Sequence, residues 1–214
     1  VQTCALPIYS LSYGSSVGHI NASSNSITNC SEYGVAINTQ IKVSICENNI
    51  DTTSYGVFWF SGATSDISVI SNTISNTTNT AVAPSSVTNI NVSNNLINTV
   101  GGSGIAVDTC DNVIVSENIV KSAASRGIYI QASCTVVSVI GNTLKSNILG
   151  MFINAGALVI NNSMSGNTTN FAGQFVPMGE IGTSATPSVS GMQTATCTPA
   201  APLTITNFLN GYTG

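Results

Sequence analysis

The chain of 214 residues carries very little charge. Asp, Glu, Lys and Arg make up 6% of it, against roughly a quarter of an ordinary soluble protein. Only four residues are Lys or Arg, and eight are Asp or Glu, so the formal net charge is −4. Nucleic-acid binding depends mainly on cations that neutralise phosphates. Four cations therefore exclude a sequence-independent nucleic-acid-binding protein.

Long apolar runs are missing as well. No stretch approaches the ~18 uninterrupted apolar residues of a membrane-spanning helix, although 43% of the residues are hydrophobic. We therefore expect no membrane span, and the apolar residues must be spread over short elements. In place of charge the chain has Ser, Thr and 25 Asn residues. Because Asn side chains compete with the helix backbone for hydrogen bonds, this composition argues against an all-helical fold.

An eight-residue motif recurs through most of the chain. It consists of an apolar, a polar and an apolar residue, two mostly polar residues, Asn, any residue and an apolar residue. The first copy runs from Ile20 to Ile27 and a later one from Val113 to Val120. Successive copies are 20 to 24 residues apart, and their Asn residues are Asn25, Asn48, Asn72, Asn95, Asn118, Asn142 and Asn162.

A second motif follows each Asn: a small residue and then alternating apolar positions, as in Gly104-Ile-Ala-Val107. In the last copy we align Gly173-Gln-Phe-Val176 with it. Each period thus holds at least two short strands. A leucine-rich repeat has a similar period but needs a regular Leu framework, and the segments here show no helical apolar spacing. The pattern predicts an all-β fold, a right-handed single-stranded parallel β-helix of about seven coils.

In such a coil, equivalent residues stack about 4.8 Å apart, and the apolar face is buried only against neighbouring coils. We expect the Asn residues to form an inward ladder at a turn, each amide bonding the next. Two apolar columns should also point inward. One holds Ile20, Val43, Ile67, Ile90, Val113 and Val137, and the other holds Ile27, Ile50, Ile74, Ile97, Val120 and Leu144.

Over residues 18–179 the repeat resembles those of the pectate-lyase-like superfamily. This superfamily includes polysaccharide lyases, glycoside hydrolases, epimerases, phage tailspikes and bacterial surface proteins. The resemblance implies polysaccharide as the partner and an extracellular, cell-surface or virion location. Tailspike relatives are usually trimers, so the resemblance is compatible with a homotrimer, although the sequence itself does not specify an oligomeric state.

The two ends depart from the repeat. Residues 1–8 read as the translated end of a sequencing adapter, and we expect them to be an artefact. Residues 9–180 are assigned to the β-helix. In residues 181–214, alternating apolar residues such as Leu203 and Ile205 predict further strands. We interpret this segment as the start of a C-terminal β cap or β-sandwich that is incomplete.

The outward residues of the second strand form the natural binding face, because side chains alternate in direction along a strand. Aromatic rings beside amides suit sugars, which offer apolar faces and hydroxyl edges; ordinary strand propensity is the alternative reading. One outward column holds Ala36, Phe58, Ala83, Ala106, Tyr129 and Phe152, and the next holds Asn38, Phe60, Ser85, Asp108, Gln131 and Asn154. The predicted substrate-binding residues are Phe58, Phe60, Tyr129, Gln131, Phe152 and Asn154.

For catalysis, glycoside hydrolysis needs two carboxyl groups that flank the scissile bond. The best local pair is Asp108 and Asp111, with Arg126 and Lys121 on the next coil. The alternative is that these Asp residues cap turns. The chain lacks the adjacent Asp pair and Gly-His-Gly segment of polygalacturonase relatives. It also lacks the three stacked acids that would hold calcium in a lyase, so we expect no metal and no cofactor.

Cys110 and Cys134 occupy equivalent positions one coil apart, within the reach of a disulfide. Either a bridge or two buried thiols fits this spacing. For the whole chain, the first hypothesis is a β-helix module that binds polysaccharide along the outward strand face. The alternatives are a glycoside hydrolase or polysaccharide lyase of the same superfamily and a purely structural spacer.

Overall fold

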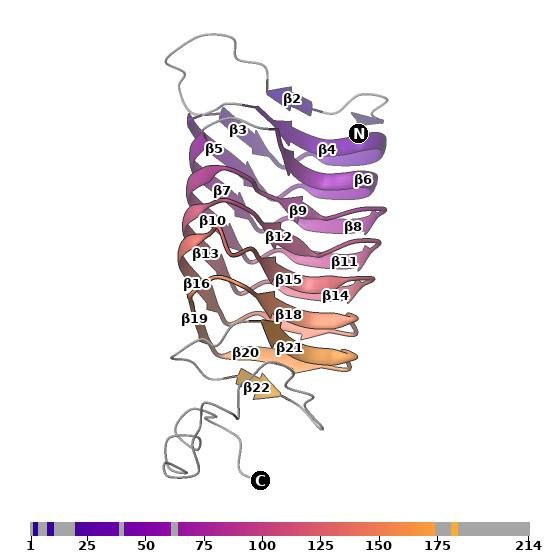
Figure 1. The fold of residues 1–214 in the computed structure, drawn as a ribbon. Coiled ribbons are helices and arrows are strands. Elements are labelled where there is room, and N and C mark those ends of the chain that lie inside the picture. Colours follow the sequence, from indigo (N-terminus) through magenta and orange to yellow (C-terminus); the bar gives the residue numbers. More distant parts are fainter. Residues whose placement is uncertain are drawn as a thin grey trace, which may run out of the picture.

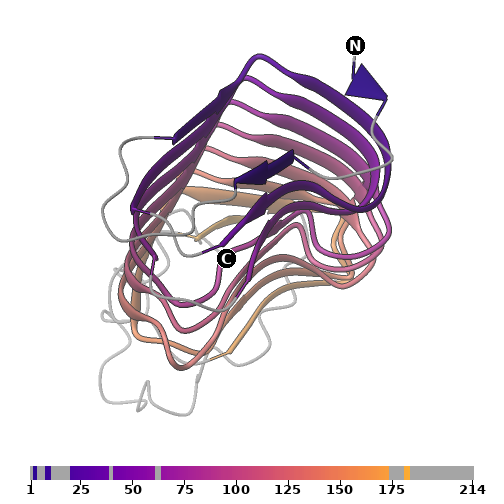
Figure 2. The ribbon, with the colours of Figure 1, turned by 90° about the horizontal axis from the view of Figure 1, so that it is seen from above.

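The computed structural model describes residues 2–3, 8–10, 20–38, 41–60, 64–173 and 181–183. Within these ranges the chain is all-β and contains no helix, so none of them includes a helix that could cross a membrane. Strands of successive coils pair in parallel and stack into a solenoid (Figure 1). Viewed from above, the coils superimpose around one interior (Figure 2). The predicted parallel β-helix is confirmed.

Each coil contributes strands to three faces. Face one is a 7-stranded parallel sheet. Its strands are β3 (Ile20–Ser23), β5 (Ile41–Cys46), β7 (Thr64–Ile70), β10 (Val87–Ser93), β13 (Asp111–Ser116), β16 (Thr135–Ile140) and β19 (Ala157–Ile160).

Faces two and three belong to one 15-stranded sheet, because β4 (Ser26–Ile37) and β6 (Asn49–Trp59) run through both. Face two continues with β8 (Thr73–Thr77), β11 (Leu96–Val100), β14 (Ile119–Ala123), β17 (Thr143–Lys145), β20 (Asn162–Ser165) and β22 (Ile181–Thr183). Face three continues with β9 (Val82–Ala83), β12 (Ile105–Val107), β15 (Arg126–Ile130), β18 (Leu149–Ile153) and β21 (Thr169–Gly173). The short strands β1 (Gln2–Thr3) and β2 (Ile8–Ser10) pair with β4.

The two predicted apolar columns lie in the core in the expected register. Ile90 pairs with Ile67 on one side and Val113 on the other, and Ile97 pairs with Ile74 and Val120. All six residues of the column from Ile27 to Leu144 are fully buried. Burial of a large aliphatic side chain contributes about 1.5–3 kcal/mol, so this column is a major source of stability.

The predicted Asn ladder is confirmed along its whole length. In every link from Asn25 to Asn162, one residue's backbone N–H and Nδ2 both donate to the next residue's Oδ1, at 2.9–3.0 Å. From Asn48 onward these side chains are at most 2% exposed. A buried polar group is costly without partners, and here each amide is satisfied by its neighbours.

The corners of the coil explain much of the remaining Asn, Ser and Gly. Among the described residues, nineteen non-Gly residues have positive φ, a conformation that Asn and Asp tolerate better than most residues. The residues immediately before the ladder Asn residues form one left-handed column, among them Ser71, Asn94 and Glu117. A second includes Asn76 and Ser122, and a third consists of Lys42, Asp66, Asn89, Asn112 and Val136.

The alignment of the last coil was wrong. Phe171, not Gln174, is the partner of Met151, so the seventh copy of the second motif is Asn170-Phe-Ala-Gly173. The last coil is shorter than the others, and Asn170 occupies the place that Gly150 has in the coil before. Beyond it, β22 adds one more strand beside β20. The rest of the predicted C-terminal segment, residues 184–214, lies outside the described residues.

Candidate functional site

Face three carries the outward column expected from the sequence. The outward residues of this column are partly exposed, while their inward neighbours along the strands are fully buried. These outward residues are Phe58, Ala83, Ala106, Tyr129 and Phe152. Strand pairing places Phe58 beside Ala83, Ala106 beside Tyr129, and Tyr129 beside Phe152. Ala36 continues the column beside Phe58 but is buried. The face therefore presents two aromatic groups separated by two small residues.

The upper aromatic cluster consists of Tyr33, Tyr55, Phe58 and Phe60. Tyr33 stacks on Tyr55 and on Phe58, with ring centroids 5.7 and 4.8 Å apart. The Phe60 ring stands edge-on to those of Tyr33 and Phe58. All four are partly exposed, which is uncommon for so many rings in one place. Tyr33 and Tyr55 were missed by the sequence reasoning, although each directly precedes the motif glycine of its coil.

The lower aromatic cluster consists of Arg126, Tyr129 and Phe152. The two rings stack with centroids 5.4 Å apart and planes inclined by 19°. The Arg126 guanidinium carbon lies 4.4 Å from the Tyr129 centroid and 5.0 Å from that of Phe152, within cation–π range. No described carboxylate forms an ion pair with Arg126. The aromatic faces and not an acid therefore hold this side chain in place.

A low saddle of small side chains separates the clusters. Phe58 and Tyr129 are three coils apart, which is about 14 Å at the spacing of paired strands. Between them the column holds only Ala83 and Ala106. Where the strands end, the backbones of Ser85 and Asp108 form a parallel β-bridge, and their partly exposed side chains border the saddle. The saddle therefore combines an apolar floor with a polar edge.

That polar edge continues past the lower cluster through Gln131 and Asn154, both partly exposed. Their backbone N–H groups donate to Val107 and Ile130 carbonyls at 3.0 and 2.9 Å, so the backbone at this edge is tied to the ladder of the sheet. The predicted binding residues Phe58, Phe60, Tyr129, Gln131, Phe152 and Asn154 thus lie on one face.

The structure places Arg126 at the opposite end of face three from Asp108. Asp108 Oδ1 accepts hydrogen bonds from Thr109 and Ser133 hydroxyls at 3.0 and 3.2 Å. Asp111 begins β13 on face one, where it accepts a hydrogen bond from Thr135. Arg126 begins β15, while Asp108 follows the opposite strand end, roughly 15 Å away along a strand. The catalytic role of these three residues stays a prediction.

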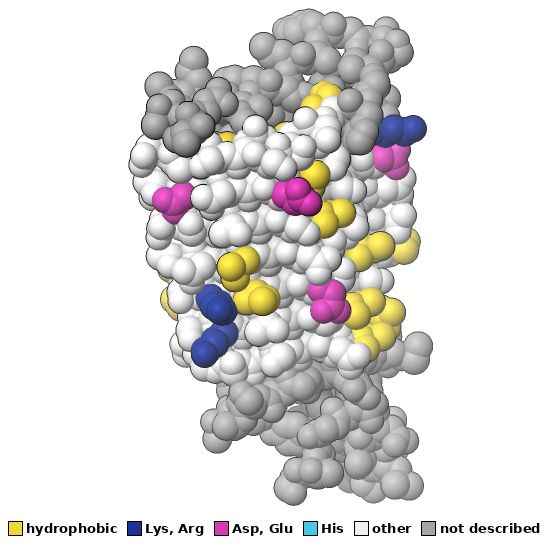
Figure 3. Space-filling model, turned by 180° about the vertical axis from the view of Figure 1, so that it is seen from behind, with side chains coloured by type: hydrophobic (Ala, Val, Ile, Leu, Met, Phe, Trp, Pro, Cys, Tyr) yellow, Lys and Arg dark blue, Asp and Glu magenta, His cyan; other side chains and the backbone are white. Residues whose placement is uncertain are grey.

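Lys121 lies on a different face from Arg126. It pairs with Lys145 on face two, where both side chains are exposed. Charged side chains are few and scattered over the surface seen from behind (Figure 3). The two strands that carry these lysines, β14 and β17, contain no acidic residue. Neither lysine contributes to the saddle.

Two buried thiols lie near the edge of the saddle. Cys110 and Cys134 are free and only 2% and 4% exposed. The Cys110 thiol donates to the Asp108 carbonyl and the Cys134 thiol to the Val107 carbonyl, at 3.1 and 3.5 Å. Burial raises the pKa of Cys110 to about 12 and raises that of Cys134 as well. Both thiols are therefore neutral near pH 7, and of the two readings the structure shows the unbridged one.

A family model described as "Right handed beta helix region" matches residues 11–172. The chain belongs to this right-handed β-helix family. A search of the curated proteins finds no match. Among solved structures, the β-helix is similar to the catalytic unit of a thermostable GH87 α-1,3-glucanase from Streptomyces thermodiastaticus strain HF3-3, with 12% sequence identity and a TM-score of 0.47. The match covers 81% of this chain and 43% of the glucanase chain. So distant a likeness does not indicate an activity.

Proposed function

We propose that this β-helix binds polysaccharide along face three, outside the cell or on a virion. The observation that carries the proposal is the pair of partly exposed aromatic clusters on one face, three coils apart with a saddle between them. A sugar chain that runs along the solenoid axis would contact both clusters. Its rings would stack on Phe58 at one end and on Tyr129 at the other.

The chemistry of the face suits such a ligand. Aromatic rings bury large area at little entropic cost, and the C–H faces of sugars are the apolar surfaces that pack on them. Mutual stacking already orients the Tyr129 and Phe152 rings, so binding would not have to order them. The polar edge of Ser85, Asp108, Gln131 and Asn154 supplies donors and acceptors for hydroxyl groups.

Affinity electrophoresis tests the proposal directly. The protein is run through native gels that contain one neutral or acidic polysaccharide each, alongside the double variant Tyr129→Ala/Phe152→Ala. We expect at least one polysaccharide to retard the protein, and the double variant to lose at least tenfold in affinity. Leu96→Ala is the matched control, because Leu96 is an exposed apolar residue on face two. Retardation that the double variant retains, or no retardation by any polymer, would overturn the proposal.

The same incubations separate binding from cleavage. The enzymatic alternative would be established if the protein released new reducing ends and if Asp108→Asn or Asp111→Asn abolished that release. Retention without new reducing ends would support a binding module. A structural spacer predicts neither result.

A further inference from the structure

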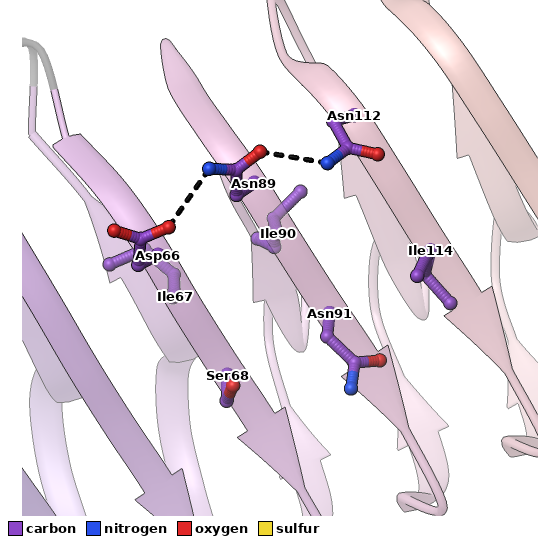
Figure 4. Close-up of a pocket in the computed structure, with 8 residues that line it drawn as sticks. All are labelled: Asp66, Ile67, Ser68, Asn89, Ile90, Asn91, Asn112 and Ile114. Atoms are coloured by element: carbon purple, nitrogen blue, oxygen red, sulfur yellow. Dashed lines mark hydrogen bonds between the residues drawn. The ribbon is translucent and has the colours of Figure 1, made fainter.

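A second depression lies on face one, away from the aromatic clusters. It crosses β7, β10 and β13 and has a volume of about 260 Å³. The side chains that shape it are Asp66, Ser68, Asn89, Asn91, Asn112 and Ile114 (Figure 4). The inward Ile67 and Ile90, buried in the core, contribute its floor. The proposed function does not involve this surface.

One side of the depression is a hydrogen-bonded chain. Asn112 Nδ2 donates to Asn89 Oδ1, and Asn89 Nδ2 donates to Asp66 Oδ1, both at 2.8 Å (Figure 4). All three residues are held in the left-handed conformation, with φ between 52° and 59°. Their side chains are thus aligned by the backbone and by one another. Among the described residues, no donor bonds the second Asp66 oxygen or Asn112 Oδ1, so both can accept from a ligand.

The other side consists of Ser68, Asn91 and Ile114, two residues further along the same strands and paired in register. Asn91 Oδ1 has almost no exposed surface and no hydrogen-bond donor among the described residues. Leaving such an acceptor unsatisfied costs about 1–3 kcal/mol. Ile114, beside it, is 42% exposed. Because Oδ1 is out of a ligand's reach, this side presents the Asn91 Nδ2 donor and an apolar surface.

The arrangement selects one class of ligand. The lining of the depression is rich in acceptors and includes one carboxylate and no cation. Lys42 lies beside Asp66 in the left-handed column and balances its charge, so the depression offers an anion no net attraction. A single metal ion needs its oxygen ligands within about 2.6 Å, yet Asp66 and Asn112 are two coils apart, about 10 Å. A hydroxyl-rich ring can reach both sides, because its O–H groups donate and its C–H face packs on an aliphatic side chain.

We propose that this depression binds a neutral sugar ring. Its hydroxyls donate to the second Asp66 oxygen and accept from the Asn91 Nδ2 group, and its apolar face lies against Ile114. The volume is slightly below that of pockets for drug-sized molecules, which favours a single ring over a longer ligand. The protein would then have two sugar contacts, one on face one and one on face three, that act independently.

Side-chain amide NMR signals provide the test. The methyl glycosides of glucose, galactose and mannose are titrated into ¹⁵N-labelled protein. We expect saturable shifts of the Asn89, Asn91 and Asn112 amides with at least one glycoside, and no shift of Asn98, an exposed amide on face two. Asn91→Leu and Asn89→Ala should each weaken binding at least tenfold, while the matched control Asn98→Ala leaves it unchanged. Unchanged signals of the buried Asn95 report that each variant is folded.

Three results would overturn the proposal: no shifts with any glycoside, shifts with calcium chloride but not with glycosides, or binding that survives both substitutions. The double variant Tyr129→Ala/Phe152→Ala should keep the face-one shifts. This separates failure of the face-one site from failure of the face-three proposal.

Discussion

Asn95 directs two donors, its backbone N–H and its Nδ2 group, at one acceptor, Oδ1 of Asn118, at 3.0 and 2.9 Å. Its Nδ2 also donates to the Val69 carbonyl of the coil before, at 2.8 Å. Three successive coils are thereby joined through one side chain. Because this contact fixes the register of the coils, it also sets which outward side chains of faces one and three lie beside each other.

Replacement of a ladder residue should be severely destabilising. Asn118→Leu keeps the volume but leaves the Asn95 N–H and the Val92 carbonyl without their Asn118 partner, and it removes one of the two donors to Asn142 Oδ1. At about 1–3 kcal/mol for each of the two unsatisfied groups, we expect a loss of at least ~2 kcal/mol in the free energy of unfolding, measured by urea denaturation. Asn98→Ala, an exposed amide of the neighbouring coil, should change it by less than about 0.5 kcal/mol. Equal effects of the two variants would contradict the ladder's structural role.

Val136 is the one β-branched residue in the left-handed column of Asp66, Asn89 and Asn112. Its φ is 47°, and its side chain is 70% exposed, so it gains little burial to offset the strain. Val136→Asn should stabilise the protein by about 1 kcal/mol and raise the Tm by roughly 2–4 °C in calorimetry. Ile114→Asn is the control, because Ile114 is an exposed residue of face one without positive φ. A lower Tm for Val136→Asn would show that the corner is not strained.

Gly104 lies at a close contact between neighbouring coils, where its backbone packs against the Val120 side chain and the Gly127 backbone. A Cβ at this position would lie 2.7 Å from the Gly127 carbonyl oxygen and would overlap Val120. Gly104→Ala should therefore cost about 1–3 kcal/mol through overpacking. Gly156→Ala, where a Cβ meets nothing within 4 Å, should be neutral or slightly stabilising. Thermal denaturation of the two variants compares these costs, and similar Tm values would refute the close approach.

Burial of the Cys110 thiol predicts a loss of stability at high pH. Its pKa is raised from 9.0 to about 12, mainly by desolvation, so above pH 9 the unfolded chain releases a proton that the folded chain keeps. The stabilisation is full below pH 9 and is lost as the pH rises toward 12. When the pH is raised from 8 to 10.5, the urea midpoint should fall more for the native chain than for Cys110→Val. An equal fall in both would mean that the folded thiol ionises freely.

The coil register could be predicted because it repeats in the sequence. Seven Asn residues near a constant spacing, each flanked by apolar residues, leave few alternatives to stacked turns, and the columns around Ile90 and Ile97 follow from strand alternation. The outward positions of Phe58 and Tyr129 follow from the same alternation. In contrast, the last coil was misaligned at Gly173, because a shortened coil changes the spacing on which the alignment depends.

Other features of the structure could not be predicted, because no single residue type recurs at their positions from coil to coil. The left-handed corners accept Ser, Thr, Glu, Asn, Lys and even Val, so no single residue identifies them. A second, shorter ladder forms where Asn147 donates to Asn167 Oδ1 at 2.8 and 3.0 Å, but earlier coils have Val100 or Ala123 at this corner. The face-one depression was also missed, because it depends on how three left-handed residues align their side chains.

The most direct test of face three as the binding face is a crystal structure of the protein soaked with the oligosaccharide that best competes with the retained polymer. The account predicts sugar rings stacked on Tyr129 or Phe58, with the chain crossing Ala83 and Ala106 toward the other cluster. A fully occupied oligosaccharide bound elsewhere, with the saddle empty, would contradict it.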